Sequence, residues 1–150
     1  MQPQISVQLD DFDIGNEINQ LKVDKHDIGA VVSFVGTVRD LADGLTSMTL
    51  EHYPAMTEAE LARIAKEAKE RWPLEGCRII HRFGELFPGD NIVLVITASA
   101  HRQAAFDAAN FIMDFLKTNA PFWKKETTSR GAKWVDANDA DDKALERWQK

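Results

Sequence analysis

The segment CRIIHRFGELFPGDNIVLVITAS, residues 77–99, carries the pattern from which the rest of the fold is predicted. Residues 77–86 and 91–98 are rich in apolar and β-branched side chains, and the Pro-Gly-Asp sequence at 88–90 is typical of a turn. This pattern predicts two strands that form a hairpin. The second strand is apolar enough to lie at the centre of a sheet.

Helical patterns lie on both sides of this hairpin. Upstream, Thr57 and Glu60 have the spacing of a capping box, and apolar residues recur behind them at helical intervals until Pro73. Downstream, a wide apolar stripe over about residues 101–118 predicts a core helix, with Ser99 as its cap. Because the hairpin lies between two helices, we expect an α+β sandwich rather than a doubly wound parallel sheet.

The remaining elements are expected to be shorter. The predicted strands are residues 29–39, 45–53, 123–128 and 132–135, and a charged helix is predicted at 139–149. In the second of these strands, Met48 and Leu50 alternate with Thr49 and Glu51, which indicates one buried and one exposed face.

Length and composition limit the classes of function. A chain of 150 residues fits one domain, 1–150, and its formal charge of -6 disfavours nucleic-acid binding. One cysteine, Cys77, excludes a disulfide framework, and we expect it to pack as a small apolar residue. The N-terminus has no signal-peptide pattern and no apolar run could span a bilayer, so we expect a cytoplasmic protein.

Basic residues are nevertheless concentrated in one part of the chain. Between residues 99 and 134 there are six basic and three acidic side chains. His101 and Arg102 are at the predicted start of the core helix, where backbone N–H groups already favour an anion. Lys117 is at the other end of that helix, where a lysine can simply interact with the helix dipole. The aromatic residues that follow it add a second interpretation, in which the amine acts as an acid, a base or a nucleophile.

The length of this helix separates the two candidate sites. At 1.5 Å per residue, His101 and Lys117 lie about 24 Å apart, so one small ligand cannot contact both within one chain. Either they serve different sites, or two subunits form a composite pocket. Arg39 could bind an anion or make a surface ion pair with Asp40, and the latter is the simpler interpretation from the residues alone. His26, His52 and His81 lack metal-ligand spacing and are interpreted as structural or surface residues.

Five blocks of sequence together resemble the large, catalytic subunits of molybdopterin synthase, the MoaE family. The blocks are FVGTVRD (34–40), LEHYPAMTE (50–58), HRFGELFPGD (81–90), SAHRQAAF (99–106) and LKTNAPFWKKE (116–126). The resemblance implies an α/β-hammerhead type of α+β fold, with mixed or antiparallel sheet and packed helices. It also implies a homodimer with a small ubiquitin-like partner at each end, which together form a heterotetramer.

The reaction implied by the resemblance is a sulfur transfer. Cyclic pyranopterin monophosphate (precursor Z) is converted to molybdopterin, and two sulfurs come from the thiocarboxylated Gly-Gly terminus of the small subunit. No metal or other cofactor is implied. The corresponding pocket residues are Thr37, Val38, Arg39, His101, Arg102, Lys117, Lys124, Lys125 and Glu126.

Among these residues, the resemblance makes Lys117 and Lys124 the catalytic candidates. Lys117 would act as an acid, a base or an attacking amine, and Lys124 would position groups and stabilise charge; the others would bind substrate. Relatives carry an arginine near the position of Asn138, and here the nearest basic residues are Arg130 and Lys133. The alternative function is a non-catalytic dimeric module that binds a phosphorylated metabolite.

Overall fold

The centre of the fold is an antiparallel pair of strands, β4 (Leu74–Arg82) and β6 (Asn91–Ser99). The computed structural model describes residues 1–42, 44–118, 122–135, 146 and 148. In it, β1 (Gln4–Gln8) pairs parallel to β4, and β2 (Ala30–Thr37) pairs antiparallel to β6. The resulting sheet A has the order β1-β4-β6-β2. Residues 93–99 of β6 are all buried, which confirms the predicted central strand.

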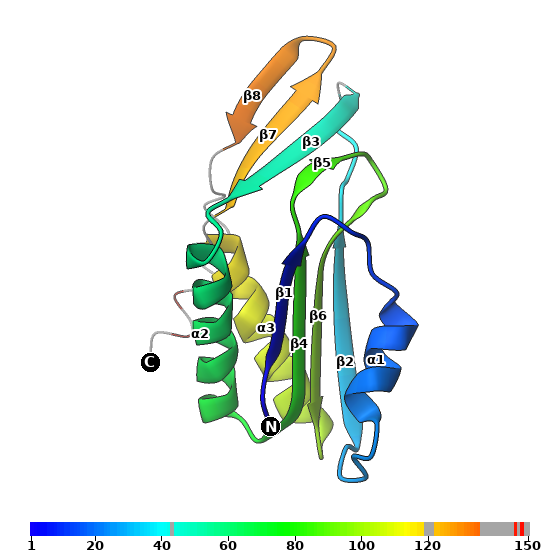
Figure 1. Ribbon diagram of the computed structural model, residues 1–150, viewed down its shortest axis with the longest axis vertical. Coiled ribbons are helices and arrows are strands. Elements are labelled where there is room, and N and C mark those ends of the chain that lie inside the picture. The colour runs from blue at the N-terminus through cyan, green and yellow to red at the C-terminus, as the bar shows by residue number, and fades with distance from the viewer. Residues whose placement is uncertain (43, 119–121, 136–145, 147, 149–150) are drawn as a thin grey trace.

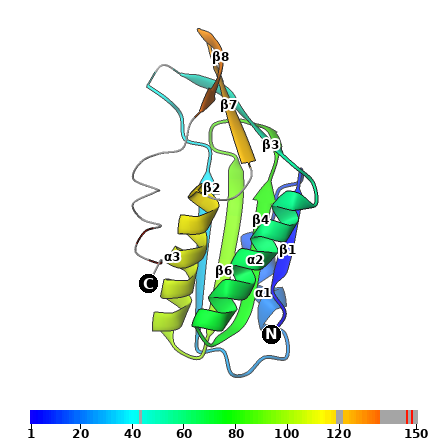
Figure 2. The ribbon, with the colours of Figure 1, turned by 90° about the vertical axis from the view of Figure 1, so that its left-hand side faces the viewer.

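Helices cover both faces of sheet A (Figure 1, Figure 2). The long helices α2 (Met56–Arg71) and α3 (Arg102–Thr118) lie side by side on one face, and the short helix α1 (Ile14–Lys22) lies on the other. Because successive strand residues point to opposite faces, Ile79 packs in the core with α2 and α3, whereas Ile80 packs in the core with α1. The predicted α+β sandwich is therefore confirmed.

A second, smaller sheet lies at one end of the molecule (Figure 1). Sheet B consists of β5 (Gly84–Leu86), β3 (Leu45–His52), β7 (Phe122–Thr128) and β8 (Gly131–Val135), in that order. Its small core of Val38, Leu45, Met48, Leu50 and Leu86 is separate from the cores around sheet A. The strands predicted within 45–53, 123–128 and 132–135 are confirmed.

The prediction of one continuous strand over residues 77–86 is wrong. The strand β4 ends at Arg82, and β5 pairs with β3 in the other sheet. Gly84, the first residue of β5, has a φ of 91°, a left-handed conformation that glycine adopts without strain. The chain therefore leaves sheet A and enters sheet B at this glycine.

Both predicted helix caps are also wrong. Helix α2 begins at Met56, its N-cap is Ala55 with a φ of 65°, and no side chain caps it. Thr57 lies inside the helix and is buried. Ser99 is the last residue of β6, and its hydroxyl donates to the carbonyl of Pro73 at 2.8 Å. Thr57 is the second residue of α2 and Ser99 ends β6, so neither residue occupies the N-cap position.

The N-terminal strand and helix were not anticipated from the sequence. Helix α1 is capped by Asp13, whose Oδ1 accepts the N–H of Asn16 at 2.9 Å. It packs beside Gly76 of β4, where an added Cβ would lie only 2.6 Å from the side chain of Leu21. The salt bridge from Arg78 Nε to Glu17 Oε2, at 3.0 Å, also joins α1 to β4.

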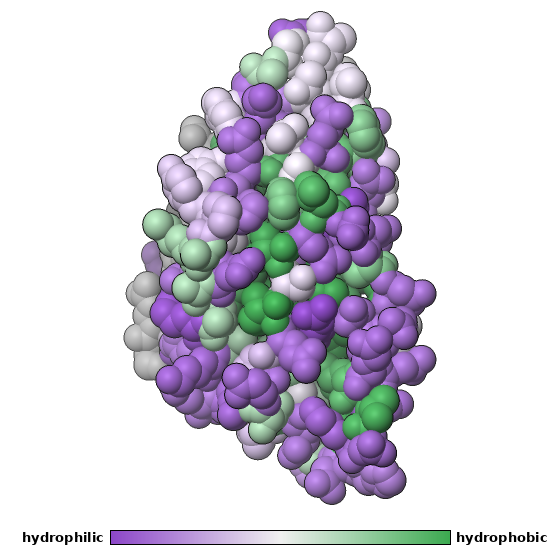
Figure 3. Space-filling view, in the orientation of Figure 1, coloured by the Kyte–Doolittle hydropathy of each residue, from purple (hydrophilic) through white to green (hydrophobic). Residues whose placement is uncertain are grey.

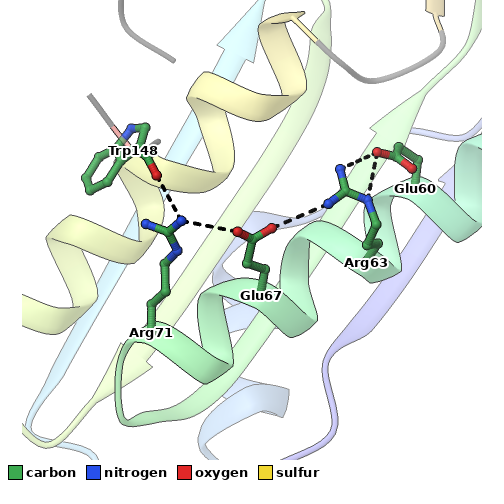
Figure 4. A network of polar contacts seen from close by, with 5 residues as sticks. All are labelled: Glu60, Arg63, Glu67, Arg71 and Trp148. Atoms are coloured by element: carbon green, nitrogen blue, oxygen red, sulfur yellow. Dashed lines mark hydrogen bonds and ion pairs between the residues drawn. The ribbon is translucent and has the colours of Figure 1, made fainter. Parts of the chain in front are cut away.

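Trp148 packs against α2 and α3 (Figure 4). Its indole makes edge contacts with Trp72 and Phe111, and its Nε1 donates to Asp114 Oδ2 at 2.5 Å. Its carbonyl accepts from Arg71 at 2.9 Å, and Arg71 also pairs with Glu67 of the same helix. Of the predicted helix 139–149, only residues 146 and 148 are among those described.

The surface seen in Figure 3 is mainly hydrophilic, with apolar side chains visible in a strip along the middle of that face. Within the described ranges, no helix has the length and apolar content needed to cross a membrane.

Candidate active site

The first three predicted site residues lie where β2 ends. The strand finishes at Thr37, after a bulge, and the chain continues through buried Val38 to exposed Arg39. The N–H of Val38 donates to the carbonyl of Asp90, and the N–H of Gly89 donates to the carbonyl of Val38, both at 2.8 Å. These two hydrogen bonds hold the segment against the turn before β6 and determine where Arg39 leaves the sheet.

The predicted ion pair between Arg39 and Asp40 does not form. The Oδ1 atom of Asp40 instead accepts the N–H groups of Leu41 at 2.8 Å and Leu45 at 2.7 Å. The salt bridges among the described residues do not include Arg39. Asp40 thus shapes the connection to β3, and the exposed guanidinium of Arg39 is not held by its neighbour.

The candidate residues of helix α3 lie at opposite ends of that helix. Lys117 is in the last turn, near sheet B, whereas Arg102 is the first residue and His101 immediately precedes it (Figure 1, Figure 2). All three side chains are exposed. The 17-residue helix keeps these ends about 24 Å apart, so within one chain a small ligand beside Lys117 cannot also reach His101 or Arg102.

The candidate residues on β7 lie on different faces of sheet B. Directly paired residues of antiparallel strands point to the same face, and Lys124 pairs with Leu50, which is 1% exposed. Glu126 likewise pairs with buried Met48. Lys124 and Glu126 therefore lie on the inner face.

Lys125 lies on the outer face of the same strand. It pairs with Trp134 of β8, and its Nζ is 5.7 Å from the centroid of that indole ring. The prediction grouped Lys125 with Lys124 as pocket residues. The structure separates the two side chains, because neighbouring residues on a strand point in opposite directions.

Two histidines and two phenylalanines join the sheets beside these lysines. We call His52, His81, Phe83 and Phe122 the His81 cluster. The ring of His81, from β4, stacks on Phe122 of β7 with a centroid separation of 3.7 Å and an interplanar angle of 17°. The ring of His52, from β3, lies 4.3 Å from Phe83 and 6.0 Å from Phe122.

His81 is buried and uncharged. Burial, together with the positive charges of Lys124 and Lys117, lowers the pKa of its imidazole to about 4, against the opposing effect of its hydrogen bond. That bond joins Nδ1 to the carbonyl of Arg82 at 2.8 Å. The influence of both lysines on one imidazole also indicates that Lys117 and Lys124 lie near the same point of the fold.

Sequence reasoning missed His81 because it considered histidines only as possible metal ligands. The position of His81 in the alternating pattern of the strand could have identified it. His81 follows Ile79 by two residues in the apolar strand, so it points to the same covered face. An ionisable ring in such a position, next to basic residues, is a candidate for a functional role.

Other candidates have structural explanations or lie elsewhere. Cys77 is buried, which raises the pKa of its thiol to about 12 and confirms the predicted apolar packing. In the part of the chain that the structure describes, no group of three or more His, Cys, Asp or Glu residues could hold a metal ion. Arg130 and Lys133 are exposed around the β7–β8 turn, and Asn138 is outside the described residues.

Comparison with known proteins identifies the family. Residues 7–119 match the family model of the MoaE protein. The chain belongs to the MoaE family. A MoaE relative from Mesorhizobium japonicum, named molybdopterin synthase catalytic subunit, is 55% identical over 149 residues, covering 98% of this chain and 94% of the relative.

Solved structures of MoaE proteins have the same fold. The molybdopterin biosynthesis MoaE protein of Burkholderia ambifaria has a TM-score of 0.86 and 52% sequence identity, with 99% of each chain covered. A chain from a complex of subunits 1 and 2 of the Helicobacter pylori molybdopterin-converting factor has a TM-score of 0.74 at 19% identity. That match covers 88% of this chain and 90% of the other, and it shows a shared fold.

Proposed function

We propose that this chain is the catalytic subunit of a molybdopterin synthase, an enzyme of sulfur transfer in molybdenum cofactor biosynthesis. It converts cyclic pyranopterin monophosphate to molybdopterin. The observation that carries the proposal is the position of two amines, Lys117 and Lys124, beside His81 where the two sheets meet, with His101 and Arg102 at the far end of α3. The family's relatives, named catalytic subunits, support it.

The separation along α3 supports a homodimer with shared sites. A phosphorylated pterin needs cationic contacts beside the reacting groups. Within one chain, His101 and Arg102 lie about 24 Å from Lys117, which is too far for one small ligand to contact both. In a symmetric dimer, the start of α3 in one subunit meets the lysines of the other. Each site then combines the phosphate contacts of one subunit with the amines of its partner.

The sulfur comes from a second protein. Cys77 is 2% exposed and its pKa is raised to about 12, so the chain's own thiol is unsuited to carrying sulfur. A small ubiquitin-like subunit with a thiocarboxylated Gly-Gly terminus delivers it instead. After each transfer, water hydrolyses the bond between the terminal acyl carbon and the transferred sulfur, which releases that terminus as a carboxylate. The solved complex of two subunits in the Helicobacter pylori protein supports such a partner. The resulting heterotetramer works in the cytoplasm.

The lysines have different roles in this proposal. Lys117 is exposed at the helix end and acts as an acid, a base or the attacking amine. Lys124 lies half-buried on the inner face and stabilises developing negative charge. Substrate contacts come from Thr37, Val38, Arg39, His101, Arg102 and Glu126. Lys125, whose side chain lies on the outer face of β7 over Trp134, makes at most a weak contribution. No metal or cofactor takes part.

A reconstituted reaction tests this function. The protein is mixed with a thiocarboxylated small subunit and precursor Z, and a dithiolene-bearing pterin is sought by mass spectrometry. We expect Lys117→Ala to lower product formation about 100-fold or more, with Lys22→Ala on the distant helix α1 as the unaffected control. Unchanged product formation in Lys117→Ala would contradict the role of Lys117. Precursor binding by the wild-type protein without any product would support the non-catalytic module instead.

A further inference from the structure

His81 lies where sheet A, sheet B and the end of α3 meet, and the roles given above do not include it. It pairs with Val7 of β1 and Val93 of β6, so its neighbours within sheet A are apolar. The titratable groups that face it from other elements are His52 of β3, Lys117 of α3 and Lys124 of β7. One neutral ring is therefore placed beside two amines.

The hydrogen bond of His81 shows which of its two ring nitrogens carries the proton. Nδ1 lies 2.8 Å from the carbonyl oxygen of Arg82. A carbonyl oxygen can only accept, so the proton of the neutral imidazole is on Nδ1. Nε2, on the other side of the ring, is left with a lone pair that can accept a hydrogen bond.

Stacking fixes the direction of the ring relative to β7. Phe122 lies flat on His81, at 17° and 3.7 Å. Phe122 and Lys124 are two residues apart on one strand, so their side chains leave it on the same face. Lys124 is therefore the next side chain along the face that carries the stacked ring, and its charge acts on His81 more strongly than that of Lys117.

We propose that His81 is a positioning residue, whose Nε2 accepts a hydrogen bond from the ammonium group of Lys124 and so directs this lysine toward the substrate. The proposal rests on the function proposed above for Lys124. A neutral acceptor suits this task because it holds the ammonium without removing its charge, as a carboxylate partner would largely do. A protonated imidazole would have no acceptor atom and would add a third positive charge.

Three substitutions at His81 separate positioning from packing. His81→Gln keeps a polar acceptor at the far end of the side chain. His81→Asn keeps a donor near the Arg82 carbonyl but is too short to place an acceptor at the position of Nε2. His81→Phe keeps a ring that stacks on Phe122 but has no polar atom. We expect His81→Gln to retain kcat within about threefold, and both other variants to lose about tenfold or more in kcat with KM for precursor Z little changed. If the role were only packing, His81→Phe would be the most active variant and His81→Gln the least, and this order would overturn the proposal.

The pH profile adds a second test. Because burial keeps His81 neutral above about pH 5, the ratio of kcat between wild type and His81→Gln should stay constant from pH 6 to pH 8. A ratio that changes more than about threefold across this range would show that the imidazole itself titrates during the reaction, which contradicts a neutral acceptor.

Chemical labelling tests the contact without any turnover. Brief acetylation with acetic anhydride, followed by peptide mass spectrometry, measures the reactivity of the Lys124 amine relative to exposed Lys22. We expect Lys124 to react about threefold faster in His81→Phe and in His81→Asn than in wild type and His81→Gln, because the amine is released. Equal rates in all four proteins would overturn the proposal about His81. Failure of the wild-type protein to form product, with the labelling pattern as expected, would overturn only the proposed function.

Discussion

The two sheets of this protein differ in how much of each is covered. Sheet A has helices on both faces, and its central strand β6 is buried from residue 93 to residue 99. Sheet B has one small core of five buried residues, and every residue of β8 is exposed. The difference indicates that sheet A supplies most of the stability, whereas sheet B presents charged side chains at the junction.

This division explains why the candidate active site lies at the junction. Lysine side chains cannot be placed in the core of sheet A without a large desolvation cost. At its edge, however, β7 brings Lys124 next to the buried ring of His81, and α3 ends there with Lys117. A rigid sheet thus supports groups that remain reachable by a substrate.

The largest expected effect is the loss of an aromatic side chain from the core beside sheet A. This change tests whether sheet A contributes more than sheet B to the free energy of unfolding. Phe111 of α3 is fully buried against α2 and sheet A, so Phe111→Ala is expected to lower the free energy of unfolding by about 3–5 kcal/mol. Trp134 of β8 is 54% exposed, and Trp134→Ala should cost less than about 1 kcal/mol. Urea unfolding of both variants measures the difference. Equal losses would show that sheet B contributes as much as sheet A.

Acidification should weaken the junction between the sheets. The pKa of His81 is about 4 in the folded protein and 6.5 as the ordinary value, so between these values the unfolded state binds more protons. The free energy of unfolding should therefore fall as pH decreases from 6.5 to 4, and His81 should account for about 3 kcal/mol of this loss. His81→Gln removes this part of the pH dependence, and His26→Gln, in an exposed loop, retains it. Parallel curves for wild type and His81→Gln would contradict the burial of a neutral imidazole.

Substitution of two neighbouring lysines shows which face of β7 contributes to catalysis. Lys124→Ala should lower kcat about 100-fold, which corresponds to about 2.7 kcal/mol of transition-state stabilisation. Lys125→Ala should lower it less than tenfold, because Lys125 lies on the outer face over Trp134. Steady-state kinetics of the reconstituted reaction measure both. The reverse order would place the substrate on the outer face of sheet B.

The smallest expected effect concerns the C-terminal contact with the helices. Trp148→Ala removes the indole contacts with Trp72 and Phe111 and the hydrogen bond to Asp114. We expect a loss of about 1–2 kcal/mol in the free energy of unfolding, since Trp148 packs at the margin of the core. Urea unfolding measures it, and Glu146→Ala, at an exposed position, is the control. A loss as large as that of Phe111→Ala would show that Trp148 contributes as much to stability as a residue of the main core.

Periodicity and turn residues were sufficient for the long elements. The alternation in β3, the apolar run of β6 and the stripes of α2 and α3 were all predicted, because each reflects a face buried against sheet A or its partner sheet. The short elements β1 and α1 were missed. They are stabilised by contacts with β4, which lies 74 residues from β1 and 61 residues from Glu17 of α1 in the chain. Contacts between such distant segments leave little local pattern.

The candidate site was predicted as a set of residues but not as an arrangement. Charge and the family resemblance pointed to Lys117, Lys124 and Arg39, and the resemblance gave Lys124 and Lys125 different roles. They did not show that these two lysines lie on opposite faces of β7, and they did not include His81. These distinctions depend on strand register and on ring stacking across two sheets.

Local chemistry along the chain was therefore enough to establish the class of fold, the family and the types of side chain that take part. Folding settled which of these side chains meet. The chain crosses from one sheet to the other at Gly84, the inner face of β7 receives Lys124, and a buried imidazole lies beside it. The physical reason is that burial and electrostatic influence depend on distance in space, and groups from β3, β4, α3 and β7 become neighbours only when the two sheets pack together.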